Sequence, residues 1–194
     1  HHFLHLHFHV FVMPPRLSLE PEFSGLRPTT IRALDASPHG DLVAVGSSKQ
    51  VLLFQPKTCE CIGVLPFPEG ECTNIRFSRS AKLLLAGGGV AAKSGCVVIW
   101  DVASAQRVME LGEEYDEVLA ADISADQRLV ALGGAAKVVR LLQTVDGSVE
   151  SEITKHTDWI TSVAFSPDSV LLATGDRAGN LFLWESFGAR HWGD

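Results

Sequence analysis

The sequence predicts an all-β protein built from four consecutive antiparallel meanders. Two sets of regularly spaced positions lead to this prediction. A serine that ends a β-prone run recurs at intervals of 41, 46 and 42 residues, at Ser37, Ser78, Ser124 and Ser166. A large residue that ends a later run recurs at intervals of 46, 42 and 42 residues, at Phe54, Trp100, Leu142 and Trp184. Because the two sets agree, we infer one structural unit of about 42 residues that occurs four times.

Each unit contains short β-prone runs separated by turn signals. In residues 160–186, ITSVAFSPDSVLLATGDRAGNLFLWES, the turns are expected at Pro167-Asp168 and at 177–179. A period near 42 with four short strands is typical of β-propeller blades, since one blade cannot bury both of its faces without a neighbour. Propellers usually close with four blades or more, so we expect four blades in an incomplete ring.

The runs KHTDWITSVAFSPDSVLLATGD and GCVVIWD resemble the repeats of the WD-repeat (WD40) β-propeller family, whose signature extends from Gly-His to Trp-Asp. The resemblance covers residues 30–186, in repeats at about 30–67, 68–111, 112–153 and 154–186. It implies a fragment of a bacterial-type multidomain WD-repeat protein. Outside the repeats we expect an N-terminal extension at 1–29 and a C-terminal tail at 187–194, which would leave the fourth blade with three strands.

The family's repeats carry a structural tetrad of His, Ser or Thr, Asp and Trp. In the fourth repeat the resemblance places three members of the tetrad on His156, Thr174 and Trp184, with Ala178 where the Asp is expected. A Trp-Asp ending is present only at Trp100-Asp101. The sequence therefore predicts that no blade completes the tetrad and that hydrophobic packing holds the blades together.

Propellers of this family bind their partners at the rim of the central channel. By resemblance, the rim positions flank the start of each inner strand or precede the tetrad Asp, and they fall on Arg32, Glu71, Thr73, Glu117, Trp159, Thr161 and Arg177. Trp159 has two interpretations. An exposed aromatic ring is a typical anchor of an interface, but the ring could instead pack beneath its own loop.

The composition restricts the classes of partner. With 16 Lys and Arg against 23 Asp and Glu, the net charge of −7 argues against nucleic acid, whose binding needs concentrated positive charge. The acidic run at 113–117 is either a solvated loop or an attraction for a basic partner. The four cysteines form no CxxC or CxxCH motif, so we expect free thiols and no attached haem.

The N-terminal run HHFLHLHFHVFVM alternates histidine with apolar residues. As a strand it would place His5, His7 and His9 on one face, where a transition metal could bind, but the run upstream of Met13 also fits an over-extended reading frame. Residues 5–12 could also supply the missing strand of the last blade, whose open edge would otherwise favour self-association. The run is too short to span a membrane, and it lacks the features of a signal peptide, so the compartment stays unknown.

Motifs for catalysis or nucleotide binding are not found. Neither GxSxG nor HExxH occurs, and the polar residues expected on the inner strands are only Asp35, Arg76 and Asp122. GGGVAAKS at 87–94 has Ala92 in place of the last glycine of a phosphate loop and precedes a strand, so we expect a long hairpin connection. The sequence thus predicts a non-catalytic interaction scaffold without cofactor or metal. The alternative is the propeller part of a larger enzyme or c-type-cytochrome-linked protein, with the chemistry elsewhere.

Overall fold

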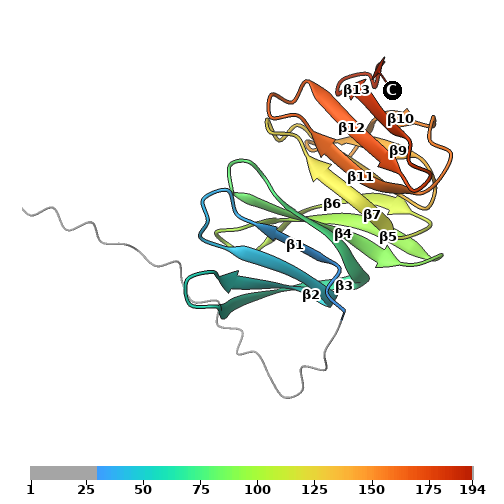
Figure 1. Ribbon diagram of the computed structural model, residues 1–194. Helices are drawn as coiled ribbons and strands as arrows, with labels where there is room; N and C mark the ends of the chain where they lie inside the picture. The colour runs from blue at the N-terminus through green and yellow to red at the C-terminus, as the bar shows by residue number, and fades with distance from the viewer. Residues whose placement is uncertain (1–29, 194) are drawn as a thin grey trace, which may run out of the picture.

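The computed structural model describes residues 30–193, which form antiparallel strands and no helix (Figure 1). The first sheet has six strands in chain order, β1 (Ala33–Ala36), β2 (Val43–Gln55), β3 (Glu60–Phe77), β4 (Leu83–Val90), β5 (Ser94–Asp101) and β6 (Arg107–Glu114). The second has β7 (Val118–Ile123), β8 (Leu129–Gly134), β9 (Val139–Gln143) and β10 (Val149–Ile153). The third has β11 (Ile160–Phe165), β12 (Leu171–Asp176), β13 (Leu181–Glu185) and β14 (His191–Gly193). The predicted all-β array of meanders in an incomplete ring is confirmed.

The first two repeats share one sheet because two of its strands are longer than expected. Residues 60–66 of β3 pair with β2, whereas residues 71–77 of the same strand pair with β4. The two parts of β3 meet near Gly70, whose φ is +145° and where a Cβ would lie 2.1 Å from the carbonyl oxygen of Gly89. We call blade 1 β1, β2 and residues 60–67, blade 2 residues 71–77 with β4 to β6, blade 3 β7 to β10, and blade 4 β11 to β14.

The regularly spaced serines close the turn between the first two strands of each blade. The Oγ atoms of Ser78, Ser124 and Ser166 accept hydrogen bonds of 2.9 to 3.0 Å from the backbone N–H groups five residues later. In the same turns, Ala81, Gln127 and Ser169 have positive φ angles of 57°, 62° and 63°. The 42-residue period therefore records the chemistry of one turn.

Three hydrophobic cores lie between consecutive blades. Side chains alternate between the two faces of each strand, so Leu84 and Trp100 face blade 1, while Leu85 and Ile99 face blade 3. Trp184 is buried in the third core, between blades 3 and 4. Trp100 and Trp184 are 0% and 5% exposed, whereas Trp159 and Trp192 are 40% and 61% exposed, which confirms the expected burial of the first pair.

The last blade has a fourth strand, so the expectation of three strands was wrong. Strand β14 lies within the expected tail and pairs with β13 through Leu183 and Gly193 and through Trp184 and His191. The rings of His191 and Trp184 lie 5.1 Å apart, so an aromatic contact helps to hold the short strand. The blade edge that was expected to recruit a strand is therefore occupied. The alternative strand at 5–12 lies outside the described residues.

The glycine-rich segment at 87–94 belongs mostly to strands and not to a long connection, which corrects that expectation. Strand β4 continues to Val90 and pairs there with Ser94, the first residue of β5. No helix begins here to bind a phosphate. Within residues 30–193 there is also no long apolar helix that could cross a membrane.

Candidate interaction site

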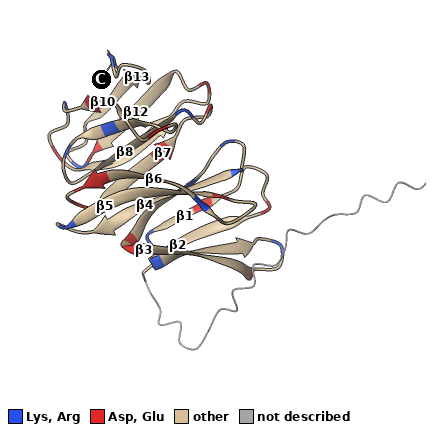
Figure 2. Ribbon diagram, turned by 180° about the vertical axis from the view of Figure 1, so that it is seen from behind, with Lys and Arg blue, Asp and Glu red and all other residues tan. Residues whose placement is uncertain are grey.

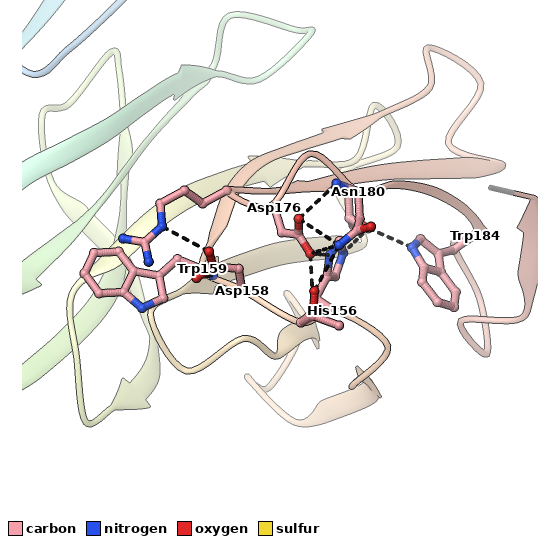
Figure 3. Close-up of polar contacts among 9 residues, drawn as sticks. His156, Asp158, Trp159, Asp176, Asn180 and Trp184 are labelled. Atoms are coloured by element: carbon pink, nitrogen blue, oxygen red, sulfur yellow. Dashed lines mark hydrogen bonds and ion pairs between the residues drawn. The ribbon is translucent and has the colours of Figure 1, made fainter.

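Four side chains of blade 4 form a buried hydrogen-bonded chain. The Nδ1 atom of His156 lies 3.0 Å from Oδ2 of Asp176, and its Nε2 atom lies 2.7 Å from Oγ1 of Thr174. The same Oγ1 atom accepts a 2.8 Å hydrogen bond from Nε1 of Trp184 (Figure 3). All four residues are at most 6% exposed, so the chain is shielded from water.

The two ends of this chain determine the direction of each hydrogen bond. The indole N–H of Trp184 can only donate, and the carboxylate of Asp176 can only accept. His156 therefore donates from Nδ1, and the hydroxyl of Thr174 donates to the imidazole while it accepts from the indole. This arrangement satisfies every polar group with a neutral imidazole, which fits a structural role.

The acidic member of the tetrad is Asp176, which corrects the prediction that Ala178 leaves the network incomplete. Asp176 ends β12, two residues before Ala178, and thus lies opposite His156. Burial alone would raise the pKa of Asp176, but hydrogen bonds from the Asn180 side chain, from His156 and from backbone amides lower it well below the ordinary range. Asn180 and its 2.9 Å bond to Oδ2 were missed in the sequence.

Blade 2 has the tryptophan without the network. Ala86 occupies the register position of Thr174, because Leu84 pairs with Trp100 as Leu172 pairs with Trp184. The Nε1 atom of Trp100 is consequently buried without a hydrogen-bond partner among the described residues. Asp101 does not reach it. Its carboxylate accepts hydrogen bonds of 2.8 and 2.7 Å from the amide and hydroxyl of Ser104 and caps a turn.

Trp159 lies on the rim, directly above the tetrad of blade 4. The guanidinium carbon of Arg177 lies 4.3 Å from the centre of the Trp159 ring, and Nε of Arg177 donates a 3.1 Å bond to Asp158. The amide of Arg177 also donates to the carbonyl of Trp159 at 2.9 Å. Since Arg177 follows Asp176, the tetrad fixes the turn that presents this cluster, which we call the Trp159 cluster (Figure 3).

The other predicted rim residues take different roles. Nη1 of Arg32 in blade 1 lies 3.3 Å from Oε2 of Glu117 in blade 3, so these two residues form an ion pair with each other. The hydroxyl of Thr73 donates to the carbonyl of Gly87 at 3.2 Å and contacts the carbonyl of Val118, which links blade 2 to blade 3.

The two rim residues that remain have a different position. Glu71 lies in β3 and pairs with Gly89. Thr161 is exposed next to Trp159. The structure thus brings together Trp159, Thr161 and Arg177 on blade 4.

The two inner-strand aspartates join neighbouring blades. Oδ2 of Asp35 accepts the amide of Phe77, and Oδ2 of Asp122 accepts the amide of Phe165, both at 2.8 Å. Burial raises the pKa of Asp122, against the effect of the hydrogen bonds from the amides of Phe165 and Ile123. The sequence placed these carboxylates on the channel, but their role in joining blades was missed.

The acidic run at 113–117 lies beside a hollow of about 380 Å³ at the rim of blade 2. Glu114 is ion-paired with Arg140, and Oδ1 of Asp116 accepts the amide of Ala92 at 2.7 Å. Tyr115 is 93% exposed. Part of the run therefore has structural partners, and β6 contributes more negative charge to the same region (Figure 2).

The described residues contain no cluster of three His, Cys, Asp or Glu side chains that could hold a metal ion. His5, His7 and His9 lie outside them. All four cysteines are free thiols, and burial raises the pKa of Cys72 and Cys96 to about 12, which makes them poor nucleophiles.

Comparison with known protein families gives a match in the same part of the chain. Residues 147–185, which include most of blade 4, match the family described as WD domain, G-beta repeat. This segment ends one residue after Trp184 and contains the whole tetrad.

Three curated proteins illustrate the wider likeness. The chain is 26% identical over 156 residues to Periodic tryptophan protein 2 of Arabidopsis thaliana and 29% identical over 126 residues to WD repeat and SOCS box-containing protein 1 of Homo sapiens, which covers 80% and 62% of this chain. It is 27% identical over 146 residues, 74% of the chain, to Meiotic recombination protein rec14 of Schizosaccharomyces pombe. The chain spans 17%, 29% and 47% of the lengths of these relatives. The matches and the fold support a WD-repeat assignment.

Proposed function

We propose that the four blades form a non-catalytic platform that binds a protein partner at the rim, with the Trp159 cluster as the anchor. The observation that carries the proposal is the exposure of Trp159. Its ring is 40% exposed although the tetrad and the ion pair of Asp158 and Arg177 hold its surroundings in place. An aromatic ring presented on a rigid support loses little conformational entropy on binding, as expected of an interface anchor.

The surrounding charges favour a partner segment with both apolar and basic residues. The exposed guanidinium of Arg177 already has Asp158 as its counter-ion. The acidic region around Tyr115 would attract basic residues by long-range electrostatics. The relatives with WD repeats in their names are consistent with a scaffold role, and the bacterial-type multidomain affiliation remains part of this proposal.

The test is the selection of peptides from a random display library on the folded 194-residue chain, followed by affinity measurements on two variants. Trp159→Ala should weaken the selected peptides at least about tenfold, which corresponds to about 1.4 kcal/mol. The matched control is Trp192→Ala, because Trp192 is also exposed but lies on β14. Equal binding by the Trp159 variant and the wild type, or a larger loss in the Trp192 variant, would contradict the proposal.

A further inference from the structure

The two ends of the array each present a sheet face that no other described blade covers (Figure 1). Strand alternation directs one set of side chains of blade 4 away from blade 3, and we call Leu171, Ala173, Leu181 and Leu183 the tail face. It directs another set in blade 1 away from blade 2, and we call Leu34, Val43, Val45, Leu52 and Phe54 the head face. Leu181 is 60% and Leu34 is 66% exposed.

The tail face repeats a surface that receives a blade elsewhere in the chain. Ala173 pairs with Leu183 as Ala131 pairs with Leu141 in blade 3, which fixes the register. The residues of blade 3 equivalent to the tail face are at most 1% exposed beneath blade 4, and they are Leu129, Ala131, Val139 and Leu141. The tail face therefore has the apolar character and the spacing of a blade-binding surface.

The head face is equivalent to the surface that docks on such a site. The amides of Ser37 and Ser124 donate to the carbonyls of Leu42 and Leu129, so Val43 corresponds to Val130. Val130 and Leu142 pack against blade 2 in the second core, and Leu172 and Trp184 occupy the same positions in the third core. Phe54 occupies the position of Leu142 and Trp184 in the repeat. The head face and the tail face are thus the two halves of the contact that joins blades 2, 3 and 4.

The curvature of the array brings alternate blades together around one axis. Arg32 of blade 1 pairs with Glu117 of blade 3, and Nη1 of Arg79 in blade 2 donates to the carbonyl of Pro167 in blade 4 at 3.3 Å. Blades that continue with the same rotation would return to the start of the ring. Heterologous contacts of this kind form closed rings when the rotation closes, and propellers contain up to eight blades.

We propose that two copies of this chain dock head to tail, with blade 1 of each copy packed on blade 4 of the other, and close a ring of eight blades. Both contacts repeat the internal packing between blades 3 and 4. They involve faces that the Trp159 cluster does not use, so this proposal can fail while the proposed function holds, and the reverse.

The test is the solution mass of the 194-residue chain by light scattering over a concentration series. We expect a species of twice the 21.0 kDa chain mass that dissociates on dilution. Leu181→Glu in the tail face and Leu34→Glu in the head face should each give a monomer, since either change disrupts both contacts of the ring. The control is Val145→Glu, because Val145 is 81% exposed in a loop outside both faces. That variant should remain a dimer.

A mixing experiment distinguishes head-to-tail docking from other modes of dimerisation. The Leu34→Glu variant keeps an intact tail face and the Leu181→Glu variant an intact head face, so an equimolar mixture should form a one-to-one complex through one contact. Circular dichroism of each variant would show that both are folded. A wild-type chain that stays monomeric at every concentration, a Leu34→Glu variant that still dimerises alone, or variants that fail to combine would each overturn the proposal.

Discussion

Replacement of Thr174 with valine tests whether the tetrad holds blade 4 together. The hydroxyl of Thr174 lies 2.7 Å from Nε2 of His156 and 2.8 Å from Nε1 of Trp184, and Thr174 is 1% exposed. Valine has nearly the same shape, but its methyl group cannot form a hydrogen bond. Both ring nitrogens would therefore lose their partner in a place that water does not reach.

The expected loss follows from the number of groups without a partner. A buried polar group that loses its hydrogen bond costs about 1 to 3 kcal/mol, so the two nitrogens together should lower the free energy of unfolding by about 2 to 5 kcal/mol. The control is Thr174→Ser, which keeps the hydroxyl and removes one methyl group. It should cost only about 1 kcal/mol.

The assay combines a urea titration with hydrogen exchange of the backbone amides. Each blade contacts only its neighbours, so blade 4 can open while the rest of the array stays folded. We expect faster exchange in β11 to β14 of the valine variant and little change in β4 and β5. A valine variant within about 0.5 kcal/mol of the wild type, or equal losses for valine and serine, would refute the structural role of the network.

Two further predictions concern the same network. Trp184→Phe should lower the free energy of unfolding more than Trp100→Phe, because the indole of Trp184 donates to Thr174, whereas that of Trp100 has no partner among the described residues; urea titrations of both variants compare them, and equal losses would contradict the assignment. Stability should also fall as the pH drops below about 3.9, because the lowered pKa of Asp176 means that the folded chain binds fewer protons there than the unfolded chain. Asp176→Asn should be less stable at neutral pH and should lose this part of the acid dependence in titrations between pH 5 and 2.

The repeat could be predicted from the sequence because it depends on local chemistry. The serine at the end of each first strand closes a turn with its own hydroxyl or backbone, and this requirement recurs in every blade. The burial of Trp100 and Trp184 could also be predicted, since each ends a strongly apolar strand. These features need only a short stretch of chain to be recognised.

The tetrad acid and the last strand could not be predicted in the same way. The choice between Asp176 and Ala178 depends on where the turn after β12 begins, and the sequence alone gives that boundary only within a few residues. Strand β14 has three residues, too few for a periodic pattern, and it is held by contacts of its aromatic rings with Trp184. In both cases the deciding interaction joins residues whose spacing follows no repeat.

The two terminal blades are attached to the array in different ways, and the difference follows from packing. Blades 2 and 3 are covered on both faces, so blade 2 tolerates a buried Trp100 whose indole nitrogen has no partner. Blades 1 and 4 are each covered on one face and gain about half of the interblade contact. Blade 1 is joined to blade 2 by a continuous strand, β3, which pairs with both. Blade 4 has a separate sheet, and the buried network of His156, Thr174, Asp176 and Trp184 makes it rigid from within. The rim residue with the clearest interface character, Trp159, therefore lies on the blade whose polar core is complete.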